Sequence, residues 1–560
     1  MKTLFFVLGL VPSFAFAAPR ATQVFVGGRI VAEGGKPVSR TAIALSGDRI
    51  LAVGTDAEIK KLAGPETVTH DLKGQTVIPG LIDAHVHLYS LGAEKSELDL
   101  SGAKDEAAAA EIVRAKAQSV PKGSWIVGRG WDQNRWKKTD LPTAASLDKV
   151  VGENPVVLSR IDGHAAWVNT KALKLAGITR ESQDTEGGKI VRDKNGDPSG
   201  VLIDKAMSPV YRQLPSPSKT SIEEAIKLAV KEAAASGLTS VHDMSVGKEQ
   251  LEVLEDLARR RELPIRVAVY MAGRDPALVN EWLASGPKQD AYDRYLSVRG
   301  FKIFADGALG SRGAALLKPY DDDPANLGVM MATKEDIVEI SKKAARAGFQ
   351  VATHAIGDRG NRTVLDAYQE AFASYPSASS PRFRIEHAQI LSPEDIPRFA
   401  KLGVIASMQA THCTSDMPWV PARIGKKRAE DGAYSWKALL RSGAKIANGS
   451  DAPVESINPF LGLYAAMTRM DLEGKPPGGW IPKNKMSFAE ALRSFTVDAA
   501  YAAFEENQKG TLEPGKLADF VVLNEKLDTL APAKIPAVRP QMTVVGGRIV
   551  YDATKKLAEN

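Results

Sequence analysis

The stretch TVIPGLIDAHVHL, residues 76–88, decides the fold, because an apolar strand-like run leads directly into two histidines. Successive side chains of a strand point to opposite faces, so His85 and His87 face the same way and can both reach one metal ion. The apolar residues before Asp83 place the pair at the carboxyl end of the strand. Barrel enzymes keep their active sites at that end, so the stretch favours a metal site on a barrel. The alternative is a pair of polar residues without a metal, which is common at strand ends.

Four later segments repeat this arrangement. Each has a residue that could bind a metal, within an apolar run or at its end. They are VRGFKIFADG with Lys302, QVATHAIGD with His354, RFRIEHAQ with His387 and KIANGSDAPV with Asp451. Four of the eight histidines in the chain therefore fall at expected strand ends. Imidazole suits zinc, iron, nickel and copper alike, so the pattern indicates a divalent metal without choosing among them.

Strand-like runs alternate with helix-like segments such as 221–237 and 334–349, whose apolar residues recur at intervals of three and four. This alternation predicts βα units, a parallel sheet and the α/β fold class. Eight strands with intervening helices fit a (β/α)8 TIM barrel. We expect them at residues 76–88, 237–244, 264–271, 298–307, 350–358, 382–389, 403–410 and 445–454.

The hexapeptide VGGRIV occurs at 26–31 and again at 545–550, and both copies resemble a strand, a glycine turn and a strand. Short β-branched runs surround each copy, which predicts one small β-sandwich built from both chain ends. We therefore expect sandwich strands in 18–75 and 506–560, with the barrel in 76–505. An insertion at about 90–235 separates the first two barrel strands and is expected to hang over the barrel mouth, since a structureless loop of that length is unusual.

Residues 1–17 have the pattern of a secretory signal peptide, with Lys2, a short apolar stretch and Ala15-Phe16-Ala17. The sequence thus predicts a periplasmic or secreted protein without a membrane anchor. The only cysteine is Cys413, which excludes an internal disulfide. A formal net charge of +6 over 560 residues is slight, so nucleic-acid binding is not expected. The oligomeric state stays open, a homodimer being one option.

Lys302 interrupts an apolar run, where a charged lysine is costly to bury without compensation. Two explanations are open: the amine reacts with carbon dioxide to give a carbamate that bridges two metal ions, or the lysine pairs with Asp306. Asp451 is a carboxylate at the end of the last expected strand. It could bind a metal and also carry the proton of an activated water, which makes it the candidate catalytic residue.

These motifs, together with EPGKLADFVVL near the C-terminus, resemble the amidohydrolase superfamily. The segments GRGWD, DGHAAWVN and FKIFADGALGSR look like its branch called amidohydrolase family 3, which includes N-substituted formamide deformylases. The resemblance implies a (β/α)8 barrel with a companion β-sandwich and one or two divalent metals, usually zinc. By position, His85 and His87 would hold the deeper metal, His354 and His387 the outer one, carboxylated Lys302 would bridge and Asp451 would complete the site.

The expected activity is hydrolysis of a small-molecule amide or formamide at a non-peptide carbon–nitrogen bond by metal-activated hydroxide. Rival interpretations keep the metals and change the bond, as in a lactonase or esterase, a cyclic imide hydrolase or a deaminase. A non-catalytic binding protein on the same barrel is a further alternative. Five residues are candidates for substrate contact, with structural roles as the competing interpretation: His164, Trp131, Arg312, His242 and His412.

Overall fold

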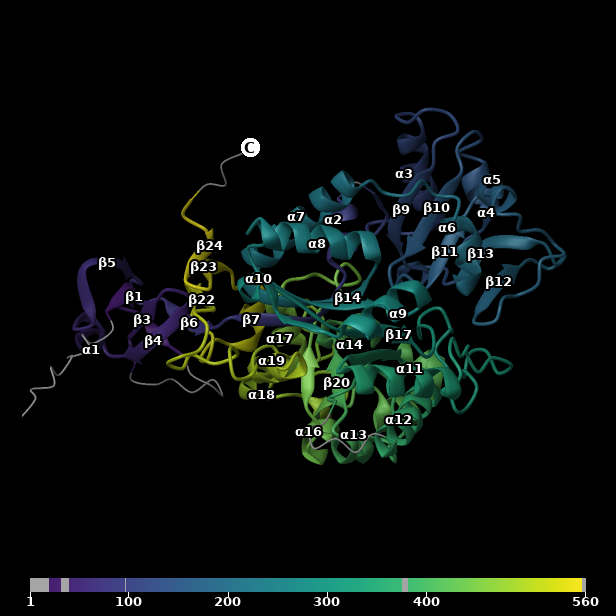
Figure 1. Ribbon diagram of the computed structural model, residues 1–560. Helices are drawn as coiled ribbons and strands as arrows, with labels where there is room; N and C mark the ends of the chain where they lie inside the picture. The colour runs from purple at the N-terminus through teal and green to yellow at the C-terminus, as the bar shows by residue number, and fades with distance from the viewer. Residues whose placement is uncertain (1–19, 32–39, 96, 375–380, 556–560) are drawn as a thin grey trace, which may run out of the picture.

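The computed structural model describes residues 20–31, 40–95, 97–374 and 381–555, so the expected signal peptide lies outside the described residues. Figure 1 shows a central barrel, strands from both chain ends on one side of it and the insertion on the other. Within the described ranges, no helix is long and apolar enough to cross a membrane.

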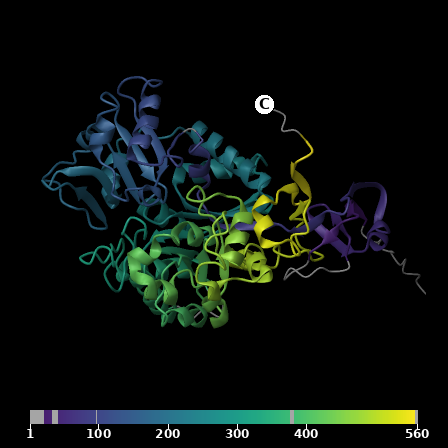
Figure 2. The same cartoon turned by 180° about the vertical axis from the view of Figure 1, so that it is seen from behind.

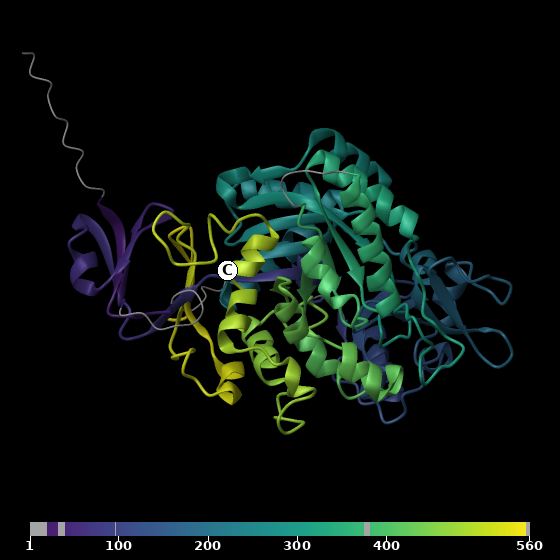
Figure 3. The ribbon, with the colours of Figure 1, turned by 90° about the horizontal axis from the view of Figure 1, so that it is seen from below.

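The barrel contains the eight predicted parallel strands, and their order in the sheet follows their order in the chain. Figure 3 shows them surrounded by helices. Each strand is buried along nearly its whole length, as expected for a parallel sheet covered on both faces. The strands are β7 (Leu81–Val86), β14 (Leu238–Val246), β15 (Arg266–Ala272), β17 (Leu296–Phe304), β18 (Gln350–Ala355), β19 (Arg384–His387), β20 (Ile405–Met408) and β21 (Ile446–Asn448).

The ring of strands is nearly closed where the first strand meets the segment after the last one. A parallel bridge joins Val86 to Ala452, just beyond β21. The amide of Asp451 donates to the carbonyl of His85 at 2.7 Å, and the amide of His87 donates to the carbonyl of Ala452 at 2.9 Å. The backbone contacts that close the barrel therefore also set Asp451 beside the two histidines.

Helices cover the outside of the barrel and bury one apolar face each, as the amphipathic pattern predicts. In one of them a capping box between Thr333 and Asp336 fixes the first turn. The helices between or after the barrel strands include α2 (Leu88–Ala93), α7 (Lys219–Ala235), α8 (Lys248–Arg259), α9 (Pro276–Ser285), α10 (Ala291–Arg294), α11 (Lys334–Ala347), α12 (Asp358–Ala373), α13 (Ile396–Leu402), α14 (Ala410–Asp416), α15 (Val420–Gly432), α16 (Trp436–Ser442), α17 (Pro459–Thr468), α18 (Phe488–Ser494) and α19 (Val497–Ala502).

Both chain ends contribute to the predicted β-sandwich, which appears beside the barrel in Figures 1 and 2. One sheet contains β1 (Ala21–Val26), β3 (Ala42–Ser46), β4 (Arg49–Gly54) and β5 (Ala63–Asp71). The other contains β2 (Arg29–Ile30), β6 (Thr76–Pro79), β22 (Phe520–Leu523), β23 (Pro540–Val545) and β24 (Arg548–Asp552). One buried apolar cluster joins the two sheets, and Phe25 contacts Phe520 in it with ring centroids 5.0 Å apart.

Two details of the expected strands differ in the structure. The stretch 76–88 is not one strand, because β6 pairs with β22 in the sandwich and only β7 belongs to the barrel. Gly80 separates them at a point where a Cβ atom would lie 2.2 Å from the Thr239 hydroxyl, so the crossing needs a glycine. Of the two VGGRIV copies, the second forms a hairpin, whereas the first leads from β1 in one sheet to β2 in the other.

The insertion folds into a six-stranded sheet with short helices, next to the carboxyl ends of the barrel strands (Figure 1). Its strands are β8 (Leu98–Asp99), β9 (Ile126–Trp131), β10 (Val156–Arg160), β11 (Ala165–Val168), β12 (Gly188–Arg192) and β13 (Pro198–Asp204). Its helices include α3 (Glu106–Ala117), α4 (Ala144–Asp148), α5 (Thr170–Leu175) and α6 (Ser208–Tyr211). The insertion sheet ends well before residue 235, and α7 instead packs its apolar face against the outside of the barrel.

Candidate metal centre

Asp451 lies among the predicted histidines at the carboxyl ends of the barrel strands. Its Oδ1 atom is 3.3 Å from Nε2 of His85 and 3.2 Å from Nε2 of His87. Its Oδ2 atom is 3.9 Å from Nδ1 of His387. Asp451 has a φ of 61° and His387 a φ of 73°, a left-handed conformation that costs non-glycine residues energy and often marks functional sites.

Each of these histidines uses one ring nitrogen to bind the surrounding protein. Nδ1 of His85 is 2.6 Å from the Glu386 carboxylate, Nδ1 of His87 is 3.0 Å from the Met244 carbonyl, and Nδ1 of His387 is 2.8 Å from Oε1 of Gln409. Metal-binding histidines are normally held in this way, which fixes the ring and leaves the second nitrogen for the ion. The arrangement therefore orients the rings as a metal site requires.

Glu386 is held in turn by Arg384, and the sequence reasoning missed both residues. The Arg384 guanidinium donates to both Glu386 oxygens, at 2.7 and 3.0 Å, and both side chains are fully buried. The alternation in RFRIEH could have revealed them, because two opposite charges two positions apart share one face of a buried strand. Arg384 also donates to Nδ1 of His242 at 2.9 Å. This contact favours a structural role for His242 over contact with the substrate.

Lys302 lies in the same cluster and is 1% exposed. Its Nζ atom is 3.3 Å from Nε2 of His85. The alternative partner, Asp306, instead accepts hydrogen bonds from the backbone amides of Ala315, Ile356 and Gly357. Burial lowers the pKa of Lys302 to about 8.

The protonation states of the cluster suit a metal ion. Burial and the nearby Lys302 lower the pKa of His85 to about 4, which keeps the ring neutral. Burial alone would raise the pKa of Asp451, but the surrounding imidazoles, chiefly that of His85, hold it well below its usual value. Metal ligands must be deprotonated, and a neutral imidazole beside an ionised carboxylate meets that condition.

The donor set fits a divalent metal. His85, His387 and Asp451 each offer one ligand atom, and these atoms lie within 4.8 Å of one another. His87 and Lys302 adjoin them, and His354 adjoins His387 with ring centroids 4.6 Å apart. The buried Nε2 of His412 has no hydrogen-bond partner in the described part of the chain and lies 3.7 Å from Asp451. The structure thus brings all six predicted ligands to one place, with the tightest group around Asp451.

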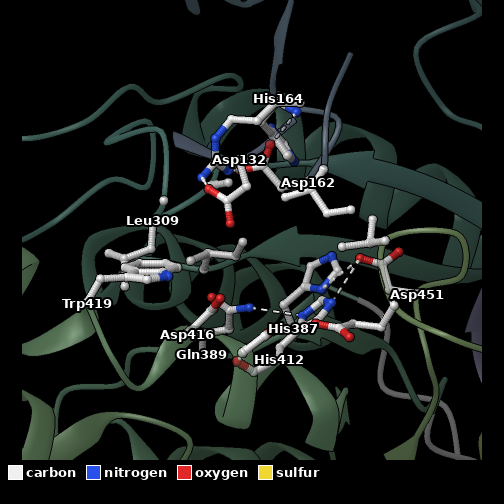
Figure 4. Close-up of a pocket in the computed structure, with 18 of the residues that line it drawn as sticks. Asp132, Asp162, His164, Leu309, His387, Gln389, His412, Asp416, Trp419 and Asp451 are labelled. Atoms are coloured by element: carbon white, nitrogen blue, oxygen red, sulfur yellow. Dashed lines mark hydrogen bonds and ion pairs between the residues drawn. The ribbon is translucent and has the colours of Figure 1, made fainter. Parts of the chain in front are cut away.

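The insertion adds His164 to this site, and Figure 4 shows it facing the barrel residues across a pocket. Its ring centroid is 4.9 Å from that of His354, and its Nδ1 is 2.6 Å from the Asp204 carboxylate. Burial would lower the pKa of His164, but the charge and hydrogen bond of Asp204 outweigh it and raise the pKa. A Cβ atom on Gly307 would lie 2.4 Å from Asp204, so this barrel glycine permits the close approach of the insertion.

Two predicted substrate-contact residues lie elsewhere. Trp131 is fully buried in the apolar core of the insertion, where its indole donates to the Leu158 carbonyl at 2.8 Å. Its expected role in substrate contact was therefore wrong, because the aromatic side chain points into the insertion core. Arg312 donates to Asp322 at 3.1 and 3.2 Å and lines neither of the two pockets at the centre. Its guanidinium is bound by that carboxylate and not by a residue of the centre.

Two pockets meet at His164, His354, His387 and Asp451. We call the first the carboxylate pocket, because Asp132, Asp162, Asp416 and Glu455 line it together with Trp419 and Leu309. Figure 4 shows Trp419 and Leu309 at one end of it and Asp451 at the other. We call the second the arginine pocket, because it is lined by Arg129, Arg212 and Arg274 together with Lys205, Phe304 and Met331.

A (β/α)8 barrel with buried histidines and a carboxylate gathered at its strand ends defines the class of metal-dependent barrel hydrolases. Comparisons with known proteins agree. An uncharacterized metal-dependent hydrolase from Pyrococcus horikoshii has a similar structure, with a TM-score of 0.73, 28% identity and coverage of 91% of this chain and 99% of that one.

The chain belongs to the amidohydrolase family, whose model matches residues 68–551. It is 34% identical to the putative amidohydrolase YtcJ of Bacillus subtilis, covering 88% of this chain and 92% of that protein. It is 26% identical to the N-substituted formamide deformylase of Arthrobacter pascens, covering 92% and 95% respectively. The protein is a metal-dependent hydrolase of this family.

Proposed function

We propose that the protein hydrolyses an amide or formamide bond of a small, non-peptide molecule. The observation that carries this proposal is the position of Asp451, whose carboxylate lies 3.2–3.3 Å from two histidines and lines both pockets. It thus adjoins both the candidate metal ligands and the space for a substrate. The similarity to a formamide deformylase supports the choice of bond.

His85, His87, His387 and Asp451 would hold a divalent metal, which we propose to be Zn²⁺, with His354 and Lys302 completing a second position. A bound metal supplies Lewis-acid polarisation of the carbonyl and lowers the pKa of water. The buried strand ends fix these donors, because each histidine is also bound to the protein through its other nitrogen.

Asp451 moves the proton in this proposal. In the overall reaction, the oxygen of water bonds to the carbonyl carbon, the carbon–nitrogen bond breaks and one proton of the water ends on the departing nitrogen. Asp451 accepts that proton as a base and then delivers it as an acid. The low pKa of the carboxyl keeps it ionised before the reaction, as a base must be.

His164 is proposed to position the substrate. It reaches the centre from the insertion, lines both pockets and is held by Asp204. With Nδ1 directed to Asp204, the ring can offer Nε2 to a substrate oxygen or nitrogen. His412 lines the carboxylate pocket and is proposed as a second contact, with its Nδ1 accepting from Gln389 at 3.1 Å.

We also propose that Lys302 is carboxylated. An ammonium 3.3 Å from the imidazole of His85, in a site that is 1% exposed, is poorly compensated, whereas a carbamate would add a negatively charged oxygen ligand. A separate proposal is export, which the pattern of residues 1–17 supports. Mass measurement of the N-terminus of protein from a periplasmic fraction tests it, with a start near Ala18 expected.

The function is tested with zinc-loaded protein and a panel of N-substituted formamides and N-acyl amines, run beside lactones, esters, cyclic imides and aminated heterocycles. We expect turnover of the formamides or N-acyl amines and release of the free amine. Turnover confined to lactones, esters or deamination substrates would overturn the proposal. The same assay on the Asp451→Asn variant shows whether any turnover belongs to this site.

A further inference from the structure

The arginine pocket contains a cation that the hydrolytic chemistry does not use. Arg274 follows barrel strand β15 and is exposed to this pocket, which also contains Lys302 and His354. Its guanidinium lies 4.3 Å from the ring centroid of Phe304, and its Nη2 atom is 3.5 Å from the sulfur of Met331. Within the described ranges it forms no ion pair with a carboxylate. Stacking on Phe304 thus holds the guanidinium beside the centre with its charge unpaired.

Further unpaired cations approach the same pocket from the insertion. Lys205 and Arg212 line it, and neither forms an ion pair with a described carboxylate. Arg129 differs, because Glu94 binds it at 2.6 Å. The pocket is therefore lined by positive charge from two directions, with Arg274 on the barrel and the other two on the insertion.

Most carboxylates that line the arginine pocket are already engaged. Asp162 pairs with Arg160, Asp204 binds His164, and Asp451 lies among the candidate metal ligands. The remaining carboxylate is Glu97, and the positive charge that most lowers its pKa is that of Arg129. A guanidinium presents paired donors that match a planar carboxylate, so the free charge of Arg274 suits a carboxylate ligand.

We propose that the arginine pocket binds a carboxylate of the substrate, with Arg274 as its principal partner, so that the substrates are amides that carry a negative charge. This inference rests on the proposed function and names its substrate class. The amide bond of the substrate would then lie at Asp451, and the part of the substrate that carries the carboxylate would extend into the arginine pocket. The opposite orientation is disfavoured, because the carboxylate pocket would place the anion beside Asp416 and Glu455.

Matched substrates test the proposal on zinc-loaded, full-length protein. N-formylphenylalanine and N-formylphenethylamine differ by one carboxylate on the amine side, and N-benzylsuccinamate and N-benzylbutanamide differ by one on the acyl side. We expect kcat/KM to be higher for the charged member of at least one pair, mainly through a lower KM. Equal or lower values for both charged members would overturn the proposal.

The Arg274→Gln variant assigns the preference to this residue. We expect the ratio of kcat/KM between charged and neutral substrate to fall by about tenfold or more, as for loss of a hydrogen bond to a charged group. Arg346→Gln is the matched control, because Arg346 lies on the exposed surface of α11 and lines neither pocket. An unchanged ratio in Arg274→Gln, or an equal fall in the control, would overturn the assignment.

A binding measurement separates this inference from the proposed function. Benzoate is titrated calorimetrically into chelator-treated full-length protein and into both variants, with benzamide as the neutral probe. We expect benzoate binding to weaken by about tenfold or more in Arg274→Gln and to be retained in Arg346→Gln. That result would uphold the anion site even if no amide were hydrolysed. Equal benzoate binding by the wild type and Arg274→Gln would overturn the anion site even if amides were hydrolysed.

Discussion

Asp451 is joined to His85 twice, through the backbone and through the side chain. Its amide donates to the His85 carbonyl at 2.7 Å, and its carboxylate lies 3.3 Å from the His85 imidazole. His85 belongs to the first barrel strand, and Asp451 follows the last. The contact that closes the barrel therefore also assembles the candidate catalytic centre, so the site can form only when the barrel is complete.

Replacing Asp451 by Asn should remove the proton carrier and preserve the shape of the side chain. We expect kcat to fall by about 10²- to 10⁴-fold, the range for loss of a general acid–base group. The hydrogen bond from the backbone amide of residue 451 to the His85 carbonyl is retained, so the circular dichroism spectrum should be unchanged. A kcat within a few-fold of the wild type would contradict the role given to Asp451.

Replacing Glu386 by Gln should weaken metal binding without touching a proposed ligand. The carboxylate orients His85, and loss of such a partner typically lowers metal affinity about 10- to 100-fold. The measurement is competition with a zinc chelator. Glu394→Gln is the control, because that side chain is 79% exposed and pairs with Arg362 away from the centre. Equal zinc affinities in the two variants would refute the orienting role.

The same Glu386→Gln change should destabilise the fold, because it leaves the buried guanidinium of Arg384 without its counter-charge. Breaking one partner of a buried ion pair costs about 3–5 kcal/mol. Urea unfolding of metal-free protein measures this cost, and a free energy of unfolding equal to that of the wild type would contradict it.

If Lys302 is carboxylated, activity should depend on dissolved carbon dioxide. Protein prepared without bicarbonate and then loaded with zinc should gain activity when bicarbonate is added, and ¹³C-bicarbonate should label the protein. Lys302→Arg removes the reactive amine, so neither effect is expected in that variant. Wild-type activity that does not respond to added bicarbonate, together with no ¹³C label on the protein, would exclude the carbamate.

Cys413 should be unreactive in the folded protein and should make it less stable at high pH. Burial raises the pKa of its thiol from 9.0 to about 12. Between these values the unfolded chain releases the thiol proton and the folded chain keeps it, so stability falls as the pH rises. Comparing wild type and Cys413→Ala by urea unfolding at pH 8 and 10 isolates this effect. A loss of stability between pH 8 and 10 that is no larger in the wild type than in Cys413→Ala would contradict this prediction. Rapid alkylation of Cys413 in the folded protein would also contradict it.

The barrel strands and the gathering of the candidate ligands could be predicted because both depend on local pattern. A buried parallel strand is a continuous apolar run, and a polar residue at its end, such as His354 or His387, stands out in the sequence. The sequence therefore indicated which residues meet, since the carboxyl ends of parallel strands share one side of a barrel.

Other features depend on contacts between distant segments. Glu386 and Arg384 appear as two charges in a buried strand, and only the fold shows that they hold His85. Trp131 stands in a motif-like segment, but the insertion sheet turns its ring into an apolar core. Gly80 marks the passage from sandwich to barrel, which the single apolar run 76–88 conceals because β6 and β7 are equally buried.

The zinc content of the chain tests the central claim most directly. Wild-type protein and the His387→Ala variant would be produced with zinc available and measured by plasma mass spectrometry. The account predicts one or two zinc ions per wild-type chain and a clear loss in the variant, with the fold retained by circular dichroism. A wild-type chain without metal, or a variant with undiminished zinc, would contradict the assignment of this cluster as the metal centre.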